Sequence, residues 1–189
     1  KTGVDTKKFT PVEQNKKLSL RKKYNIDESA KVILHIGHLN EGRNIQQLLN
    51  LSDEYFVVLI TSTLTKNEQD KQLKDAFLKR ENTLLIDDYV EHIEEIYQLS
   101  DLYLFPVIES GHCIDVPLSV LEAASCGIPV LTTDYGEIKA FKNKEGFSYI
   151  SSFENLNELV NSAINEKTNN IRNAVLDYDW NNAIDFLSR

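Results

Sequence analysis

Short apolar runs alternate with helical patterns along most of the chain. Runs of this length between helices are typical of parallel strands buried on both faces of a sheet. We therefore predict a doubly wound α/β domain whose ligands bind at the carboxyl ends of the strands. The predicted strands are 32–36, 55–61, 83–86, 102–105, 129–132 and 147–150. The predicted helices are 13–24, 43–51, 67–80, 91–99, the segment bearing Glu122, and segments after residue 150.

The length of 189 residues suits one domain with a substantial core. Residues 1–12 contain Gly3 and Pro11, and we predict that they form an extended leading linker. The chain begins at Lys1 and contains no methionine. We therefore expect it to be a fragment from which an upstream domain is missing.

Composition excludes several classes of protein. The net charge of −8 argues against a broad nucleic-acid-binding face. The basic run 16–23 is predicted to be a solvated helix face, with contact to lipid or phosphate as the alternative. Cys113 and Cys126 are too few for a disulfide framework and lack zinc-site spacing, which favours a reduced, intracellular protein. No apolar run approaches the roughly 20 residues that span a membrane.

The first loop at the predicted crevice follows strand 32–36. Gly37 would let the backbone approach a phosphate closely, and Arg43 is predicted to open a helix that favours anions. The guanidinium of Arg43 matches phosphate oxygens, so Arg43 is the leading phosphate-binding candidate, with an ordinary surface arginine as the alternative. His38 could donate to the same phosphate.

The second loop begins with Asp87 and Asp88 after a strand. An acidic pair at this position could bind a metal, as in receiver domains, but a turn and helix N-cap role is the favoured interpretation. Backbone groups near Tyr89 and Val90 could instead meet the edge of a nucleobase.

The third loop, 105–123, is dense in polar groups. Ser110, His112 and Asp115 could be imagined as a hydrolase triad, but closeness in sequence gives no triad geometry and no nucleophile elbow is present. Gly111 permits an unusual turn that could aim N–H groups at an anion. The carboxylates of this region belong to Glu109, Asp115 and Glu122.

Several ordered motifs together resemble a known family. They are GVDTKKFTP at 3–11, Gly37-His38-Leu39 with Arg43, SDLYLFP at 100–106, LEAASCGIPVLTTDYG at 121–136, and Trp180. In this order and spacing they resemble the C-terminal, donor-binding domain of retaining GT-B glycosyltransferases of group 1, which include sucrose-phosphate and mannosyl transferases. The resemblance covers nearly the whole chain.

The resemblance implies a single Rossmann-like domain over 1–189, with the N-terminal acceptor domain outside this chain. It implies transfer of a sugar, with retention, from a UDP-, GDP- or ADP-sugar to an acceptor hydroxyl, without metal or other cofactor. The implied partners are the nucleotide sugar, the missing domain and an acceptor glycan or lipid-linked glycan, with no nucleic acid. The implied location is cytoplasmic, and a peripheral position at the inner membrane face through the missing half stays open. The fragment alone is expected to be inactive.

The resemblance also implies roles for residues. Its nucleotide-sugar-binding positions correspond to Gly37, His38, Arg43, Val90, Leu118 and Glu122. Glu122 would hold the ribose hydroxyls. His38 replaces an arginine of the family, so the loop keeps one permanent cation in Arg43 and phosphate binding is expected to be weaker or pH-dependent. Ile114 stands where the family has a second glutamate. The catalytic acidic role is therefore open between Asp115, which we favour, Glu109, and no residue at all, with a charge at a helix N-terminus as the alternative for Asp115.

Two other functions are kept open. The first is a nucleotide-sugar-binding or scaffolding module that has lost catalysis, which would agree with His38 and Ile114. The second is a receiver-like signalling domain using Asp87 and Asp88.

Overall fold

The computed structural model describes residues 2–39, 41–61, 71–109, 111, 113–166 and 170–182, apart from the side chain of Glu41. Within these residues six strands form one parallel sheet in the order β3-β2-β1-β4-β5-β6. The strands are β1 (Lys31–Ile36), β2 (Tyr55–Ile60), β3 (Thr83–Ile86), β4 (Leu102–Phe105), β5 (Val130–Thr132) and β6 (Phe147–Tyr149). The predicted doubly wound α/β fold is confirmed.

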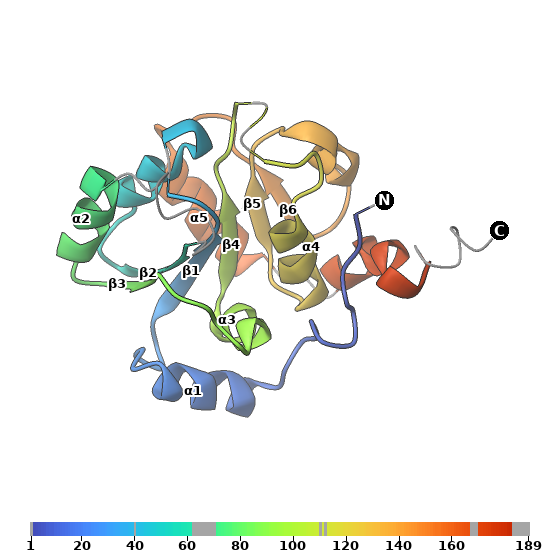
Figure 1. Cartoon of the computed structure of the whole chain (residues 1–189), viewed down its shortest axis with the longest axis horizontal. Helices are drawn as coiled ribbons and strands as arrows, with labels where there is room; N and C mark the ends of the chain where they lie inside the picture. The colour runs from blue at the N-terminus through green and yellow to red at the C-terminus, as the bar shows by residue number, and fades with distance from the viewer. Residues whose placement is uncertain are drawn as a thin grey trace.

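Helices cover both faces of the sheet, and each face has its own apolar core. Figure 1 shows α3 and α4 in front of the strands and α5 behind them. The α-helices are α1 (Gln14–Lys23), α2 (Lys71–Lys79), α3 (Ile93–Leu99), α4 (Leu118–Ser125) and α5 (Leu156–Asn165). The first part of the predicted helix 67–80 lies outside the described residues, and its remainder is α2.

The predicted helix 43–51 is wrong in type. Two short 3₁₀ segments stand there, η1 (Glu41–Arg43) and η2 (Ile45–Asn50). Asn44 separates them because its backbone is left-handed, with φ of 57°, which asparagine tolerates better than most residues. The Asn44 side chain also donates to the Pro106 carbonyl at 3.2 Å, which ties this loop to the end of β4. Further 3₁₀ segments follow as η4 (Gly136–Phe141), η5 (Ile171–Ala174) and η6 (Leu176–Tyr178).

The leading segment is more than a linker. Val4 and Phe9 are buried in the front core, and Val4 pairs in parallel with Asp179 near the other end of the chain. Arg172 donates to the carbonyls of Thr6, Phe9 and Ser125. The two ends of the described chain therefore pack against one another beside α4 (Figure 1).

The basic run on α1 is largely neutralised within the fold. Arg21 is buried and, with Lys17, binds the Asp101 carboxylate at 2.6 Å, and Lys23 pairs with Glu95. The prediction of a solvated face is therefore wrong for Arg21, holds only in part for the half-buried Lys17, and holds for Lys16, Lys22 and Lys23, which are exposed. Among the helices that the structure describes, none combines the length and apolarity needed to cross a bilayer.

Candidate functional site

The candidate site lies where β1 and β4 separate, at the position predicted for the ligand-binding crevice. These adjacent strands mark the point at which the strand order reverses, which is where open α/β sheets bind ligands. β1 pairs with β2 over its whole length but with β4 only at Ile33–Leu102 and Leu34–Tyr103. Beyond these pairs the His35 imidazole bridges the two strands, with Nδ1 2.8 Å from the Leu104 carbonyl oxygen. His35 therefore lies at the base of the crevice.

His35 is a buried, neutral imidazole. Burial is the main cause that lowers the pKa of His35 to about 4, and the nearby Arg43 guanidinium lowers it further. Nδ1 must carry the proton to bond Leu104, which leaves Nε2 as an acceptor. Nε2 is buried and has no hydrogen-bond partner among the described groups. We did not identify His35 from the sequence, because one histidine in an apolar strand is more often an ordinary core residue.

Arg43 lies against Gly37 in the crevice. A Cβ atom at Gly37 would lie 2.5 Å from Arg43 Nη1 and 3.1 Å from His35 Nε2. Arg43 is 9% exposed, so its charge is held in a largely dry position. It ends η1 and does not open a helix, which corrects the expectation of a helix N-terminus at this point. The structure thus brings Gly37, Arg43 and the unforeseen His35 together, with the half-buried His38 next along the loop.

The third loop contacts the Arg43 guanidinium through the side chain of Cys113. The thiol is half-buried, and burial raises its pKa, while Arg43 opposes that rise through its charge and a hydrogen bond. The loop is held from the far side by Tyr135, whose hydroxyl donates to the Cys113 carbonyl at 2.5 Å. Gly136, with φ of +49°, packs on the Asp115 carbonyl, which accepts from the Glu137 amide at 3.0 Å. The backbone of the loop is therefore fixed at both positions.

The acidic candidates of this loop are solvated. Glu109 and Asp115 are both exposed, and Asp115 makes no capping bond to α4, whose N-cap is Pro117. Ser110 and His112 of the imagined triad lie outside the described residues. Ile114, at the position where the family carries a glutamate, is 54% exposed.

Glu122 lies in the second turn of α4 and contacts Tyr97 of α3. Its Oε2 accepts a 2.6 Å hydrogen bond from the Tyr97 hydroxyl. Burial raises the pKa of Glu122, while Tyr97 and, more weakly, Lys8 oppose the rise. Glu122 is therefore a half-buried carboxyl group whose orientation is set by Tyr97.

The second loop contributes differently from its prediction. The Asp87 carboxylate pairs with Lys74 and accepts from the Thr61 hydroxyl at 2.9 Å. Asp88 accepts from the Tyr89 amide, which agrees with a turn role, but His92 is the N-cap of α3 and makes no side-chain cap. The N-cap prediction is therefore wrong. In the described part of the chain no three His, Cys, Asp or Glu side chains gather as metal ligands would.

Apolar side chains surround the carboxyl ends of the strands. Val90 is partly buried, whereas Leu118, the first residue of α4, is 39% exposed. Tyr89 after β3 and Ile108 after β4 are 79% and 59% exposed. Large apolar groups on the surface are typical of binding faces.

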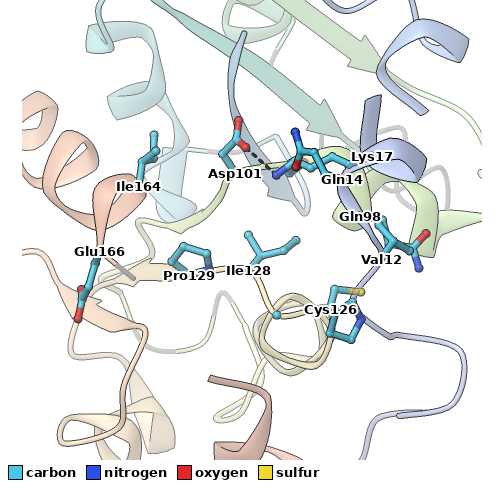
Figure 2. Close-up of a pocket in the computed structure, with 13 residues that line it drawn as sticks. Val12, Gln14, Lys17, Gln98, Asp101, Cys126, Ile128, Pro129, Ile164 and Glu166 are labelled. Atoms are coloured by element: carbon cyan, nitrogen blue, oxygen red, sulfur yellow. Dashed lines mark hydrogen bonds and ion pairs between the residues drawn. The ribbon is translucent and has the colours of Figure 1, made fainter. Parts of the chain in front are cut away.

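A cavity of about 310 Å³ lies at the amino ends of the strands, opposite the carboxyl ends where the candidate site lies. Figure 2 shows it between the start of α1 and the segments that lead into β4 and β5, with the Lys17–Asp101 ion pair on its wall. Cys126 and Glu166 also line it. None of the predicted site residues reaches this cavity, so the candidate site remains the crevice at the carboxyl ends.

Comparison with known proteins identifies the family. Residues 16–176 match the family described as Glycosyl transferases group 1. No curated protein sequence matches the chain. Similar solved structures include a glycosyltransferase from Rickettsia africae (13% identity, TM-score 0.81, all of this chain and 54% of that one). Anabaena HepE with UDP and glucose is also similar (14% identity, TM-score 0.75, 98% of this chain and 55% of that one). So is sucrose-phosphate synthase from Thermosynechococcus elongatus (15% identity, TM-score 0.76, 99% of this chain and 50% of that one). At these identities the likeness shows the fold, and the chain spans about half the length of these proteins.

Proposed function

Because the chain belongs to the group 1 glycosyl transferases, we propose that it is the donor-binding domain of a retaining enzyme. The reaction moves a sugar from a nucleotide-diphosphate sugar to an acceptor hydroxyl. The observation that carries this proposal is the buried Arg43 guanidinium against Gly37, at the point where β1 and β4 separate.

Arg43 binds the donor diphosphate in this proposal. Its guanidinium presents paired N–H donors to phosphate oxygens, and Gly37, without a side chain, leaves room for them. When the glycosidic bond breaks, negative charge grows on the departing diphosphate, and a pre-placed cation of low exposure stabilises that charge. His38 is a neutral and weaker donor in the same loop.

The nucleoside part lies across the third and second loops. Glu122 accepts from the ribose hydroxyls, while Val90 and Leu118 flank the base. The solved HepE structure with UDP-glucose shares this fold, which supports a nucleotide-sugar donor. UDP-, GDP- and ADP-sugars are the donors to be tested, and no resident cofactor is proposed.

Catalysis is assigned to Asp115, with Glu109 as the second candidate. Both carboxylates are solvated and lie on the loop that leads to α4. The acceptor, a glycan or a lipid-linked glycan, is bound by a further N-terminal domain, so the described chain alone is inactive. We place the enzyme in the cytoplasm, with any membrane contact made by that further domain.

Thermal-shift measurements of this chain with UDP, GDP and ADP test the proposal. We expect one nucleoside diphosphate to raise the melting temperature by several degrees. Arg43→Ala and Glu122→Ala should each abolish that rise, while Lys22→Ala, an exposed cation on α1, should not. If a folded sample responds to none of the three, the site assignment is wrong.

A non-catalytic module is the second candidate, favoured by the exposed Ile114 in place of a carboxylate. The enzyme together with its N-terminal domain separates the two, because donor binding without hydrolysis or transfer supports the module. The receiver alternative is excluded by the fold. Receivers have the strand order 2-1-3-4-5, and this sheet has 3-2-1-4-5-6.

A further inference from the structure

We propose that Tyr97 is a positioning residue for Glu122, binding one carboxylate oxygen so that the other is presented to the ribose hydroxyls. The inference rests on the proposed function, because Glu122 is the ribose contact there. It adds a residue to which neither the sequence motifs nor the crevice pointed.

The hydroxyl of Tyr97 is held in one place. Tyr97 is fully buried on α3, and its ring packs edge-on against Phe9 at 5.6 Å and tilted against Tyr103 at 6.1 Å, measured between ring centroids. A ring wedged from both sides cannot swing away from α4. The 2.6 Å bond to Glu122 Oε2 therefore fixes the orientation of the carboxylate.

The groups around Glu122 leave Tyr97 as its main stabilising partner. Lys8 of the leading segment acts on it electrostatically but forms its ion pair with Glu94, at 3.3 Å. Cys126, one turn later on α4, has a pKa raised by burial and stays a neutral thiol. Tyr103 on β4 is also neutral and donates to Ser119. Tyr97 thus supplies the direct hydrogen bond that opposes the cost of ionising a buried Glu122.

The consequence is chemical. A vicinal diol offers two O–H donors, and an ionised carboxylate accepts both, whereas a protonated carboxyl has lost acceptor capacity. By favouring the ionised form and occupying Oε2, Tyr97 directs Oε1 and its lone pairs to the ligand. Loss of the hydroxyl should leave α3 packed and weaken only contacts that depend on the ribose.

The test compares two nucleotides on three proteins. The nucleotides are whichever of UDP, GDP and ADP stabilises the wild-type chain, and its 2′,3′-dideoxy analogue. The proteins are wild type, Tyr97→Phe and the matched control Tyr103→Phe, which removes the hydroxyl of another fully buried tyrosine that is bonded to Ser119 at 2.7 Å. We expect Tyr97→Phe to weaken the ribonucleotide about tenfold and the dideoxy analogue not at all. The control should keep the wild-type preference for ribose.

A pH series gives a second readout. Without Tyr97 the pKa of Glu122 rises further, so Tyr97→Phe should lose ribonucleotide affinity at a higher pH than wild type as the solution is acidified. Equal weakening of both nucleotides, or an unchanged ribose preference, overturns the inference and leaves the proposed function intact. Absence of any nucleoside diphosphate binding by the wild type overturns both.

Discussion

At the scale of single residues, a substitution at Gly37 should affect ligand affinity much more than folding stability. A methyl group there would lie 2.5 Å from Arg43 Nη1, which is the far end of a flexible side chain. Because this side chain is flexible, the guanidinium can move away with little loss of folding stability. It would then no longer point toward the diphosphate. We expect Gly37→Ala to weaken the diphosphate about tenfold and to shift the melting temperature by only a few degrees, as measured by calorimetric titration and thermal unfolding.

The control for this prediction is a double-mutant cycle. If Gly37 acts by making room for Arg43, then Gly37→Ala should have little further effect on affinity in the Arg43→Ala background. Additive losses would show that Gly37 instead contacts the ligand directly.

Some residues were accessible from the sequence and others were not. The positions of Arg43 and Gly37 after an apolar strand, and of Glu122 in its motif, pointed to one edge of the sheet, and the strand order places these segments there. His35 was missed, because its importance depends on where the pairing of β1 with β4 stops, and that is a tertiary property. The N-cap role assigned to Asp87 and Asp88 failed because α3 begins only at Ile93, with His92 as its N-cap. Asp87 pairs with Lys74 instead.

At the scale of elements, strands were more predictable than short helices. Buried parallel strands need continuous apolar runs, so β1, β2, β4 and β5 follow directly from the pattern. The 43–51 segment has helix-forming residues, but Asn44 takes a left-handed backbone because its side chain finds the Pro106 carbonyl, far along the chain. Local propensity carries no information about that partner.

One side chain, that of Arg172, joins the leading segment, α4 and η5. Arg172 donates at 2.7 Å to Phe9 and at 2.6 Å to Thr6, and it also binds the Ser125 carbonyl. Arg172→Met removes these charged donors from the carbonyls of Thr6 and Ser125, while the Phe9 carbonyl keeps its bond from the Ser125 hydroxyl. We expect urea unfolding to show a loss of about 2–4 kcal/mol. Lys139→Ala, which removes an exposed side chain, should change stability by less than about 0.5 kcal/mol. A loss as small for Arg172→Met would mean that water replaces it freely.

At the scale of the whole molecule, His35 links stability to pH. The unfolded chain protonates this imidazole near pH 6.5, whereas the folded protein resists protonation down to about pH 4. Stability contributed by neutral His35 is therefore complete above pH 6.5 and is lost as the pH falls toward 4. The slope approaches about 1.4 kcal/mol per pH unit, and the total is about 3 kcal/mol.

His35→Asn tests this linkage. Its amide can donate to Leu104 as Nδ1 does, but it does not titrate. Urea unfolding at pH 7, 6 and 5 should give a flatter pH dependence for the variant than for wild type, with the two free energies converging as the pH falls. Parallel curves would show that His35 is not the group responsible.

The architecture of the whole was predictable to a useful degree, since alternating apolar runs and helical patterns require a parallel sheet covered on both faces. The role of the leading segment was not, because its partners lie near the other end of the sequence. Similarly, the cavity beside Lys17 and Asp101 depends on four distant segments meeting at the amino ends of the strands.

The pairing of Val4 with Asp179 also bears on how the protein is made. Residues 2–9 leave the ribosome well before their partners on η5 and η6, which lie far along the chain. Val4 and Phe9 therefore wait as exposed apolar groups while the sheet assembles behind them. Contacts so distant in sequence close slowly, so the last step in folding of this domain should join these two segments. Chaperones that recognise apolar segments can bind the first segment until the second has been synthesised.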